Sequence, residues 1–203
     1  MSQSIMNAVK KRIMGHGPGW CFTPKHFLDL DSDTGVRTAL SRLEQEKVIR
    51  RLAQGIYDYP IHHELLGLVP PDLNQVARAI SEKNGTKIQP SGAYAANLIG
   101  ISEQVPGKVV FLTDGPSKRI KIGKTEISFR TETAKAMHAA GTKEGLVIQA
   151  FKFMKKENID QAARGRTRKF LQGQSQKAVS MNLKHAPVWV RSLVFEILGD
   201  SLK

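Results

Sequence analysis

The sequence has few cysteines and no long apolar run, and both absences restrict the class of protein. Cys21 is the single cysteine in 203 residues, which excludes an internal disulfide framework and fits a reducing cytosol. No apolar stretch approaches the roughly eighteen residues that a membrane helix needs. The opening segment MSQSIMNAVKKRIMGHG lacks an uninterrupted apolar region followed by a small-residue cleavage site, so we expect no signal peptide. We therefore expect a cytoplasmic protein without membrane partners.

Residue patterns typical of enzymes are also missing. A nucleotidyltransferase needs a Gly-Ser pair followed by closely spaced carboxylates that hold Mg²⁺, whereas the acidic residues of the second half are scattered. The segment TDGPSKRIKIG lacks the spacing of a phosphate-binding loop. His62 and His63 are adjacent and so point in different directions, and Cys21 lies between Trp20 and Phe22, as core residues do. We expect no catalytic residues, no metal site and no cofactor.

Positive charge is the most informative bulk property. The formal net charge is +13, which points to nucleic acid or to an acidic protein partner. Residues 1–70 hold 9 Lys and Arg against 7 Asp and Glu, whereas residues 71–203 hold 22 against 11. Most of the excess therefore lies in the second half.

The first part of the chain predicts three helices followed by a β-hairpin. We expect helices over residues 4–14, 25–30 and 34–46, and strands over 48–52 and 55–59 that are joined by a tight turn at 53–55. Ser32 and Asp33 are candidates to cap the third helix. This order is that of a winged helix-turn-helix, and the VPPD segment reads as a linker. We predict a DNA-binding domain over 1–68 and a second domain over 72–203.

The second part predicts a small sheet and a helical carboxyl-terminal region. Helices are expected over residues 73–83, 92–98, 146–156, 161–177 and 187–198; strands are expected over 87–89, in KVVFLTDG and in RIKIGKTEISFR, which turns at Gly123 and Lys124. The fold class is therefore α+β: a winged helix-turn-helix followed by a mixed α/β domain.

The third helix has two distinct sides when wound at about 100° per residue. Val36, Leu40 and Leu43 fall on the apolar side. The opposite side presents an arginine that can address guanine, and hydroxyls that can reach phosphates or bases. The predicted DNA-binding residues are Thr34, Arg37, Thr38, Ser41 and Arg42 of this helix, and Arg50, Arg51 and Gln54 of the hairpin.

Two stretches resemble a known family. VRTALSRLEQEKVIRRLAQGIY is similar to the winged-helix domain of AbiEi antitoxins, which belong to type IV (AbiE) toxin–antitoxin systems. PSGAYAANLIGISEQVPGKVVFLTDGPSKRIKIGKTEISFR resembles the segment that follows in that family. The resemblance implies that the first domain binds inverted repeats in its own promoter and represses its operon. It also implies that the second domain counteracts a neighbouring nucleotidyltransferase toxin, directly or indirectly, and it supplies no catalytic residues.

Basic side chains gather at two places in the second half. Lys118, Arg119, Lys121 and Lys124 lie in the hairpin, and Arg164, Arg166, Arg168 and Lys169 lie in one helix. With Ile120, Ile122, Ile127 and Phe129 packed inward, the hairpin cations would be exposed. Such a surface could steer an acidic toxin, extend a DNA footprint or contact RNA.

Two other functions remain open from the sequence. One is a winged-helix regulator whose second domain senses a ligand or dimerises. The other is an RNA-binding protein that uses the basic helices.

Overall fold

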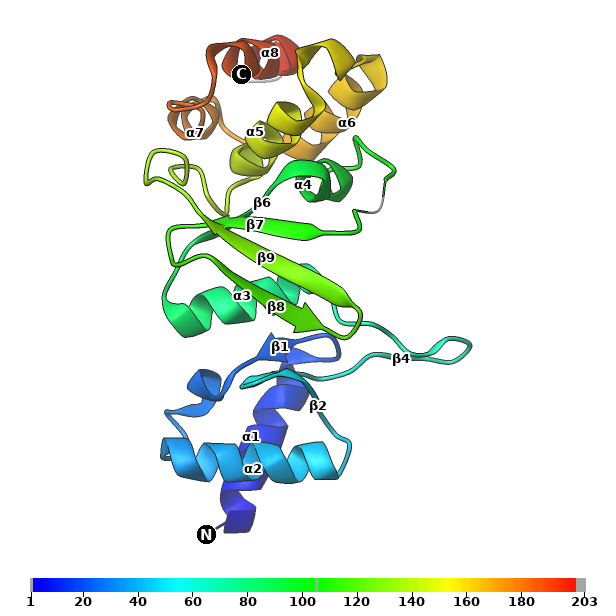
Figure 1. The fold of residues 1–203 in the computed structure, drawn as a ribbon, viewed down its shortest axis with the longest axis vertical. Coiled ribbons are helices and arrows are strands. Elements are labelled where there is room, and N and C mark those ends of the chain that lie inside the picture. Colours follow the sequence, from blue (N-terminus) through cyan, green and yellow to red (C-terminus); the bar gives the residue numbers. More distant parts are fainter. Residues whose placement is uncertain (1, 105, 200–203) are drawn as a thin grey trace. The chain divides into compact units, whose positions relative to one another are not determined.

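The computed structural model describes residues 2–104 and 106–199 and has an α+β fold (Figure 1). Its backbone packing separates two compact units. The first runs to Gly85 and includes 121–124, and the second comprises 86–120 and the chain from Thr125 onward. Each unit has its own hydrophobic core and is described by itself.

The first unit alternates helices with very short strands. In chain order these are α1 (Ser2–His16), β1 (Cys21–Phe22), the 3₁₀ turn η1 (Pro24–Phe27), α2 (Asp33–Gln45), β2 (Arg50–Ala53), β3 (Ile56–Asp58), β4 (His62–His63), β5 (Gly67–Leu68) and α3 (Leu73–Asn84). An antiparallel sheet has the strand order β1-β3-β2, while β4 and β5 form a separate hairpin.

The core of the first unit lies between α1, η1, α2 and the three-stranded sheet. Val36, Leu40 and Leu43 of α2 are fully buried there, as the helical spacing predicts. They pack in the cluster that contains Val9 of α1 and Phe22 of β1. Burying each such side chain stabilises the fold by roughly 1.5–3 kcal/mol, so this face of α2 is fixed by packing.

Three local features of the first unit bear on the sequence predictions. The Ser32 side chain accepts a hydrogen bond from the backbone N–H of Gly35 at 3.2 Å, so Ser32 is the cap of α2. The helix expected over 25–30 is only the 3₁₀ turn η1. Between the β2–β3 hairpin and the VPPD segment, where no strand was predicted, the chain forms the β4–β5 hairpin, in which His63 pairs with Gly67.

Helix α3 belongs to the first unit, although the sequence favoured a boundary before it. It contacts β1 and β3, His26 Nε2 lies 2.9 Å from Glu82 Oε2, and Lys25 Nζ donates to the Lys83 carbonyl at 2.6 Å. Gly85 ends the helix in the left-handed conformation (φ 64°), as glycine does readily. An apolar stripe predicts that a helix packs, but not which neighbour it packs against, and this is why the boundary could not be read from the stripe.

The second unit combines a helical layer with one sheet, of which only the hairpin tip at 121–124 groups with the first unit. Its elements are β6 (Ile88–Pro90), α4 (Gly92–Leu98), β7 (Val109–Thr113), β8 (Lys118–Ile122), β9 (Thr125–Thr131), α5 (Lys143–Met154), the 3₁₀ turn η2 (Lys156–Asn158), α6 (Gln161–Leu171), α7 (Gln176–Asn182) and α8 (Val188–Leu198). The strand order is β6-β7-β9-β8, with β7 parallel to β9 and antiparallel to β6. Helix α4 contacts both β7 and α5, and α5 to α8 gather beyond it (Figure 1).

The helical layer forms the larger core of the second unit. Val190, Leu193, Val194 and Ile197, the stripe predicted for the last helix, are all buried in it. The single helix expected over 161–177 is two helices, because the chain passes through Gly173 at φ 83°, a backbone conformation that interrupts a right-handed helix.

Two further properties concern the described residues as a whole. Within 2–104 and 106–199, no helix is long and apolar enough to cross a bilayer. In the same residues, no three His, Cys, Asp or Glu side chains gather in a way that could hold a metal ion.

Candidate nucleic-acid interface

The outer side of α2 is a continuous polar surface. Thr34, Arg37, Thr38, Ser41 and Arg42 are all exposed on it, opposite the buried side that packs into the core. Because that packing fixes the rotation of the helix about its axis, these five side chains face away from the unit together. The structure thus brings together the five residues that the sequence assigned to this helix.

Local hydrogen bonds orient part of this surface. Arg37 Nε donates to Asp33 Oδ2 at 2.6 Å, one helical turn away, and this pairing raises the pKa of the Arg37 guanidinium. The Thr38 hydroxyl donates to the Thr34 carbonyl at 2.9 Å, so its oxygen is left to accept. Both members of the Arg37–Asp33 pair are more than half exposed, and such a pair contributes little to stability and exchanges partners at low cost.

The β2–β3 hairpin presents two of its three predicted contact residues. Arg51 in β2 and Gln54 in the turn are exposed. Arg51 pairs with Tyr57 in the sheet register, and Arg50 pairs with Asp58. Successive side chains of a strand point to opposite faces, so Arg50 and Arg51 cannot serve the same surface.

Arg50 is directed inward, which differs from the predicted wing contact. Its Nε donates to Asp58 Oδ1 at 3.0 Å and its Nη2 to Asp58 Oδ2 at 2.5 Å. Both terminal nitrogens also lie 3.3 Å from the Val69 carbonyl oxygen. The guanidinium is therefore committed to holding the hairpin and the chain after β5, and we leave Arg50 out of the interface.

Acidic residues limit the positive charge of the interface. Asp33 is paired with Arg37, and Glu46, at the carboxyl end of α2, is exposed. This side of α2 therefore offers individual arginines and hydroxyls rather than a broad positive field.

The cations of the β8–β9 hairpin are less uniform than the sequence predicts. Lys118 Nζ lies 5.2 Å from the centroid of the Phe129 ring, within cation–π range. Arg119 Nε lies 3.9 Å from Glu126 Oε1 across the hairpin. Lys121 and Lys124 are exposed. Ile122, Ile127 and Phe129 are buried as expected, whereas Ile120 is only half-buried. Of the four hairpin cations, Arg119, Lys121 and Lys124 are therefore exposed, and Lys118 is half-buried.

The three arginines of α6 form an ion pair or hydrogen bonds with other segments of the second unit. Arg164 Nη1 lies 2.5 Å from Glu196 Oε1 of α8, Arg166 Nη1 donates to the Gly100 carbonyl at 2.7 Å, and Arg168 Nε donates to the Ile197 carbonyl at 2.6 Å. Lys169 is exposed. Of the four basic residues predicted to form a surface on this helix, the three arginines therefore have partners within the unit, and Lys169 is exposed.

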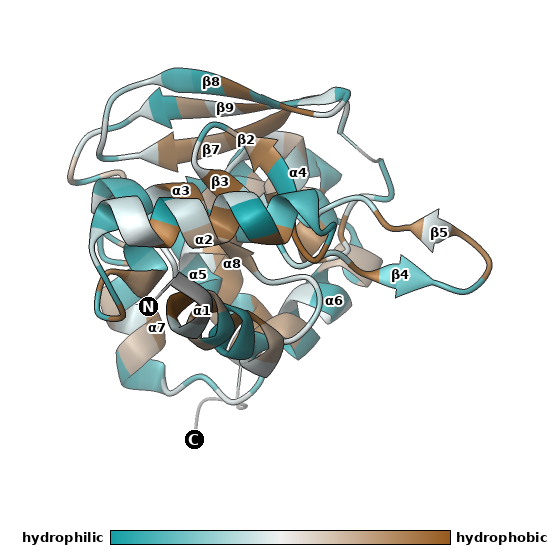
Figure 2. Ribbon diagram, turned by 90° about the horizontal axis from the view of Figure 1, so that it is seen from below, coloured by the Kyte–Doolittle hydropathy of each residue, from teal (hydrophilic) through white to brown (hydrophobic). Residues whose placement is uncertain are grey.

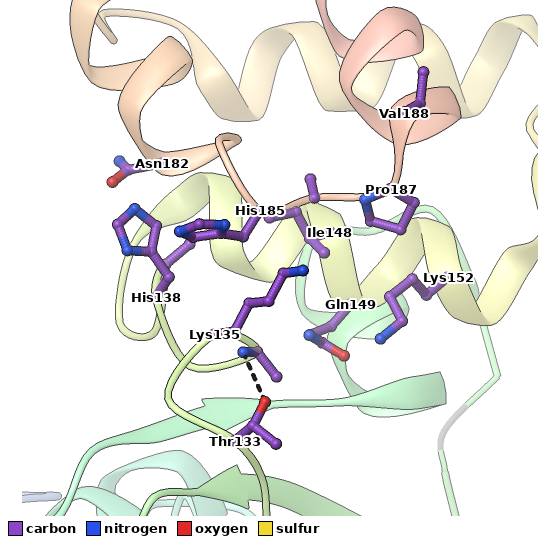
Figure 3. A pocket seen from close by; sticks show the side chains of 13 residues that line it. Thr133, Lys135, His138, Ile148, Gln149, Lys152, Asn182, His185, Pro187 and Val188 are labelled. Carbon is purple, nitrogen blue, oxygen red and sulfur yellow. Dashed lines mark hydrogen bonds between the residues drawn. The ribbon is translucent and has the colours of Figure 1, made fainter.

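A third group of cations lines a hollow that sequence reasoning missed. Lys135, His138, Lys152 and His185 come from three segments of the second unit and line one cavity of about 410 Å³ (Figure 3). They are spread over fifty residues of sequence without a motif, so no pattern in the chain could have grouped them.

Comparison with known proteins gives a family and a distant structural likeness. No curated protein matches the chain. Among solved structures, the crystal structure of the RV2827C protein from Mycobacterium tuberculosis is similar at 12% sequence identity and a TM-score of 0.46, over 94% of this chain and 80% of that chain. A family model matches residues 8–179, which is most of the chain, and the protein therefore belongs to DUF6088, a family of unknown function.

Proposed function

We propose that the first unit is a winged helix-turn-helix that binds operator DNA, with α2 as the recognition helix and the β2–β3 hairpin as the wing. One observation carries the proposal: the five polar residues of α2 are exposed on one side, while the opposite side is locked into the core. The element order α1-β1-η1-α2-β2-β3 and the strand order β1-β3-β2 are those expected of such a domain.

The chemistry of this surface suits the major groove. Arg37 and Arg42 can donate to guanine N7 and O6, the Thr38 hydroxyl oxygen can accept from a base amino group, and the Ser41 hydroxyl can bond to bases or phosphates. On binding, Arg37 would release the Asp33 carboxylate and donate to the DNA, because the exposed Arg37–Asp33 ion pair contributes little to stability. Arg51 and Gln54 would contact the backbone beside the groove.

Binding of the full chain to the DNA upstream of its own gene tests this proposal. We expect the double variant Arg37→Ala, Arg42→Ala to weaken binding by at least about 30-fold in fluorescence anisotropy, since each of the two lost base contacts is worth about 1–3 kcal/mol. Lys108→Ala, Lys177→Ala is the matched control, because it removes two exposed cations of the second unit. Equal loss in both double variants would mean that only net charge matters and would refute the assigned interface.

We further propose that the protein is an antitoxin of the AbiEi type that represses its own operon and counteracts a neighbouring nucleotidyltransferase toxin. The resemblance of the two sequence stretches supports this, as does the strong positive charge of residues 71–203. The exposed Lys121 and Lys124 are the cations best placed to meet an acidic partner.

Co-expression tests the antitoxin proposal. The full chain should restore growth to cells that express the nucleotidyltransferase encoded beside its gene, and Lys121→Gln, Lys124→Gln should reduce the rescue at equal protein level. Growth arrest that persists despite stable expression would count against neutralisation. If no nucleotidyltransferase gene lies alongside, a plain regulator is favoured, and strongly salt-dependent tRNA binding by the full chain would favour an RNA-binding protein.

A further inference from the structure

The second unit holds a cavity whose charged lining is entirely basic. It has a volume of about 410 Å³ and lies between the segment after β9, helix α5 and the link from α7 to α8 (Figure 3). This size is within the usual range for small-molecule sites, about 300–1,000 Å³. Among the described residues that line the cavity, Lys135, Lys152, His138 and His185 can carry positive charge, and none is Asp or Glu.

The two histidines are both exposed and contact each other. Their rings meet edge to face with centroids 4.8 Å apart. His138 Nε2 lies 3.1 Å from the Met181 carbonyl oxygen. A carbonyl only accepts, so Nε2 is the donor in this contact, and Nδ1 can donate to an oxyanion when the ring is in its imidazolium form.

Neighbouring cations repel the protonated form of His185. Partial desolvation lowers the pKa of His185, and the nearby His138, Lys184 and Lys135 lower it further. The carboxylate of Glu144, which is fully buried behind the lining, accepts a hydrogen bond from the lining residue Asn182 through Nδ2 at 2.9 Å. An anion in the cavity would relieve the repulsion among the cations.

The floor of the cavity adds a neutral donor and an apolar wall. Gln149 is a lining residue that is only 7% exposed, and its amide can donate to an oxyanion. Ile148, Ala186 and Pro187 line the same space. A ligand with one anionic end and an uncharged body would satisfy both kinds of lining.

We propose that this cavity binds a small phosphorylated molecule, with its phosphate group between Lys135, Lys152 and the two histidines and its uncharged part against Ile148 and Pro187. Phosphate suits the site because it offers several acceptor oxygens to donors that approach from different elements. The proposal concerns a ligand of the second unit and does not depend on DNA binding by α2.

Isothermal titration of the full chain with inorganic phosphate, AMP and adenosine tests the proposal. We expect AMP to bind at least about 10-fold more tightly than inorganic phosphate, which amounts to roughly 1.4 kcal/mol from the apolar contacts. Adenosine should bind much more weakly than AMP. Equal affinity for AMP and phosphate would support the phosphate site but overturn the role of the apolar wall, and adenosine binding as tightly as AMP would overturn the site itself.

Variants separate this cavity from general positive charge. Lys135→Gln and Lys152→Gln should each weaken AMP binding by about 10-fold or more, whereas Lys177→Gln on α7, an exposed lysine outside the cavity lining, should not. Lys152→Arg should retain most of the affinity.

A spectroscopic readout covers the case in which a lysine variant folds poorly. In the unchanged protein, saturating phosphate should raise the pKa of His185 in an NMR titration of the imidazole protons, because a bound anion favours the protonated ring. Absence of saturable binding by phosphate and AMP, with no shift of the His185 or His138 signals, would overturn the proposal. If the α2 variants bind operator DNA as well as the unchanged protein does, the DNA-binding proposal fails but the cavity proposal is unaffected.

Discussion

Arg50 and Asp58 form a bidentate ion pair across the β2–β3 hairpin, with Nε–Oδ1 at 3.0 Å and Nη2–Oδ2 at 2.5 Å. Asp58 is only 2% exposed, whereas the Arg50 side chain is 25% exposed. The pair thus carries a buried carboxylate whose charge is balanced by one guanidinium, and Arg50 also reaches the Val69 carbonyl. This geometry makes Arg50 a structural residue of the hairpin.

Arg50→Ala should therefore destabilise the protein strongly. Removing one partner of a buried pair costs about 3–5 kcal/mol, because the other charge stays buried without compensation. Arg51→Ala, next to it but exposed, should change the free energy of unfolding by less than about 0.5 kcal/mol. Urea denaturation followed by circular dichroism checks both, and similar values for the two variants would contradict the assignment.

Two helical glycines should respond in opposite directions to alanine. A Cβ at Gly145, in the first turn of α5, would overlap the carbonyl oxygen of Ala139 and crowd Gln89 Oε1. Gly145→Ala should cost about 1–3 kcal/mol, since a backbone carbonyl cannot move aside easily. A Cβ at Gly165 of α6 meets nothing within 4 Å, so Gly165→Ala should stabilise by about 0.5–1 kcal/mol. Thermal denaturation of the two variants provides the comparison.

The thiol of Cys21 should be unreactive in the native protein. Burial first, and then the nearby carboxylates of Asp58 and Asp72, raise its pKa to about 12, so almost no thiolate exists at pH 8. We expect slow reaction with a thiol reagent such as DTNB in buffer and prompt reaction in urea. Rapid labelling without denaturant would show that the thiol is accessible and ionisable.

The same shift sets the sign of a pH effect on stability. The folded-state pKa is raised above the unfolded value of about 8.5, so the contribution of Cys21 is fully present below that value. It is lost as the pH rises towards about 12. The free energy of unfolding should fall less steeply over this alkaline range in Cys21→Ala than in the unchanged protein.

The tip of the β4–β5 hairpin should be nearly neutral for stability despite its composition. Leu65 and Leu66 are 90% and 77% exposed, and the turn between these strands is coloured hydrophobic in Figure 2. Leu65→Ser, Leu66→Ser should change the free energy of unfolding by less than about 1 kcal/mol in total. Leu40→Ala, in the core of the first unit, should cost about 2–5 kcal/mol. A large loss in the double variant would show that the tip is packed in solution.

Local rules in the sequence determined much of the secondary structure. The i, i+4 and i+7 spacing of Val36, Leu40 and Leu43 settled which side of α2 is buried, because helical geometry alone relates these positions. The cap at Ser32 and the end of α3 at Gly85 followed from the same kind of local chemistry. The exposed polar side of α2 could be predicted for this reason.

Tertiary structure decided what depends on distant partners. The sequence marks Arg50, Arg164, Arg166 and Arg168 as basic, but only the fold supplies Asp58, Glu196 and the carbonyls that engage them. Likewise, α3 packs in the first unit, where Glu82 contacts His26 and the Lys83 carbonyl accepts from Lys25. The periodicity of α3 does not predict these contacts. The basic cavity exists only because folding brings Lys135, Lys152 and His185 to one place. Charge belongs to single positions and periodicity to positions close together in the chain, whereas ion pairs and the lining of a cavity depend on positions that only folding brings together.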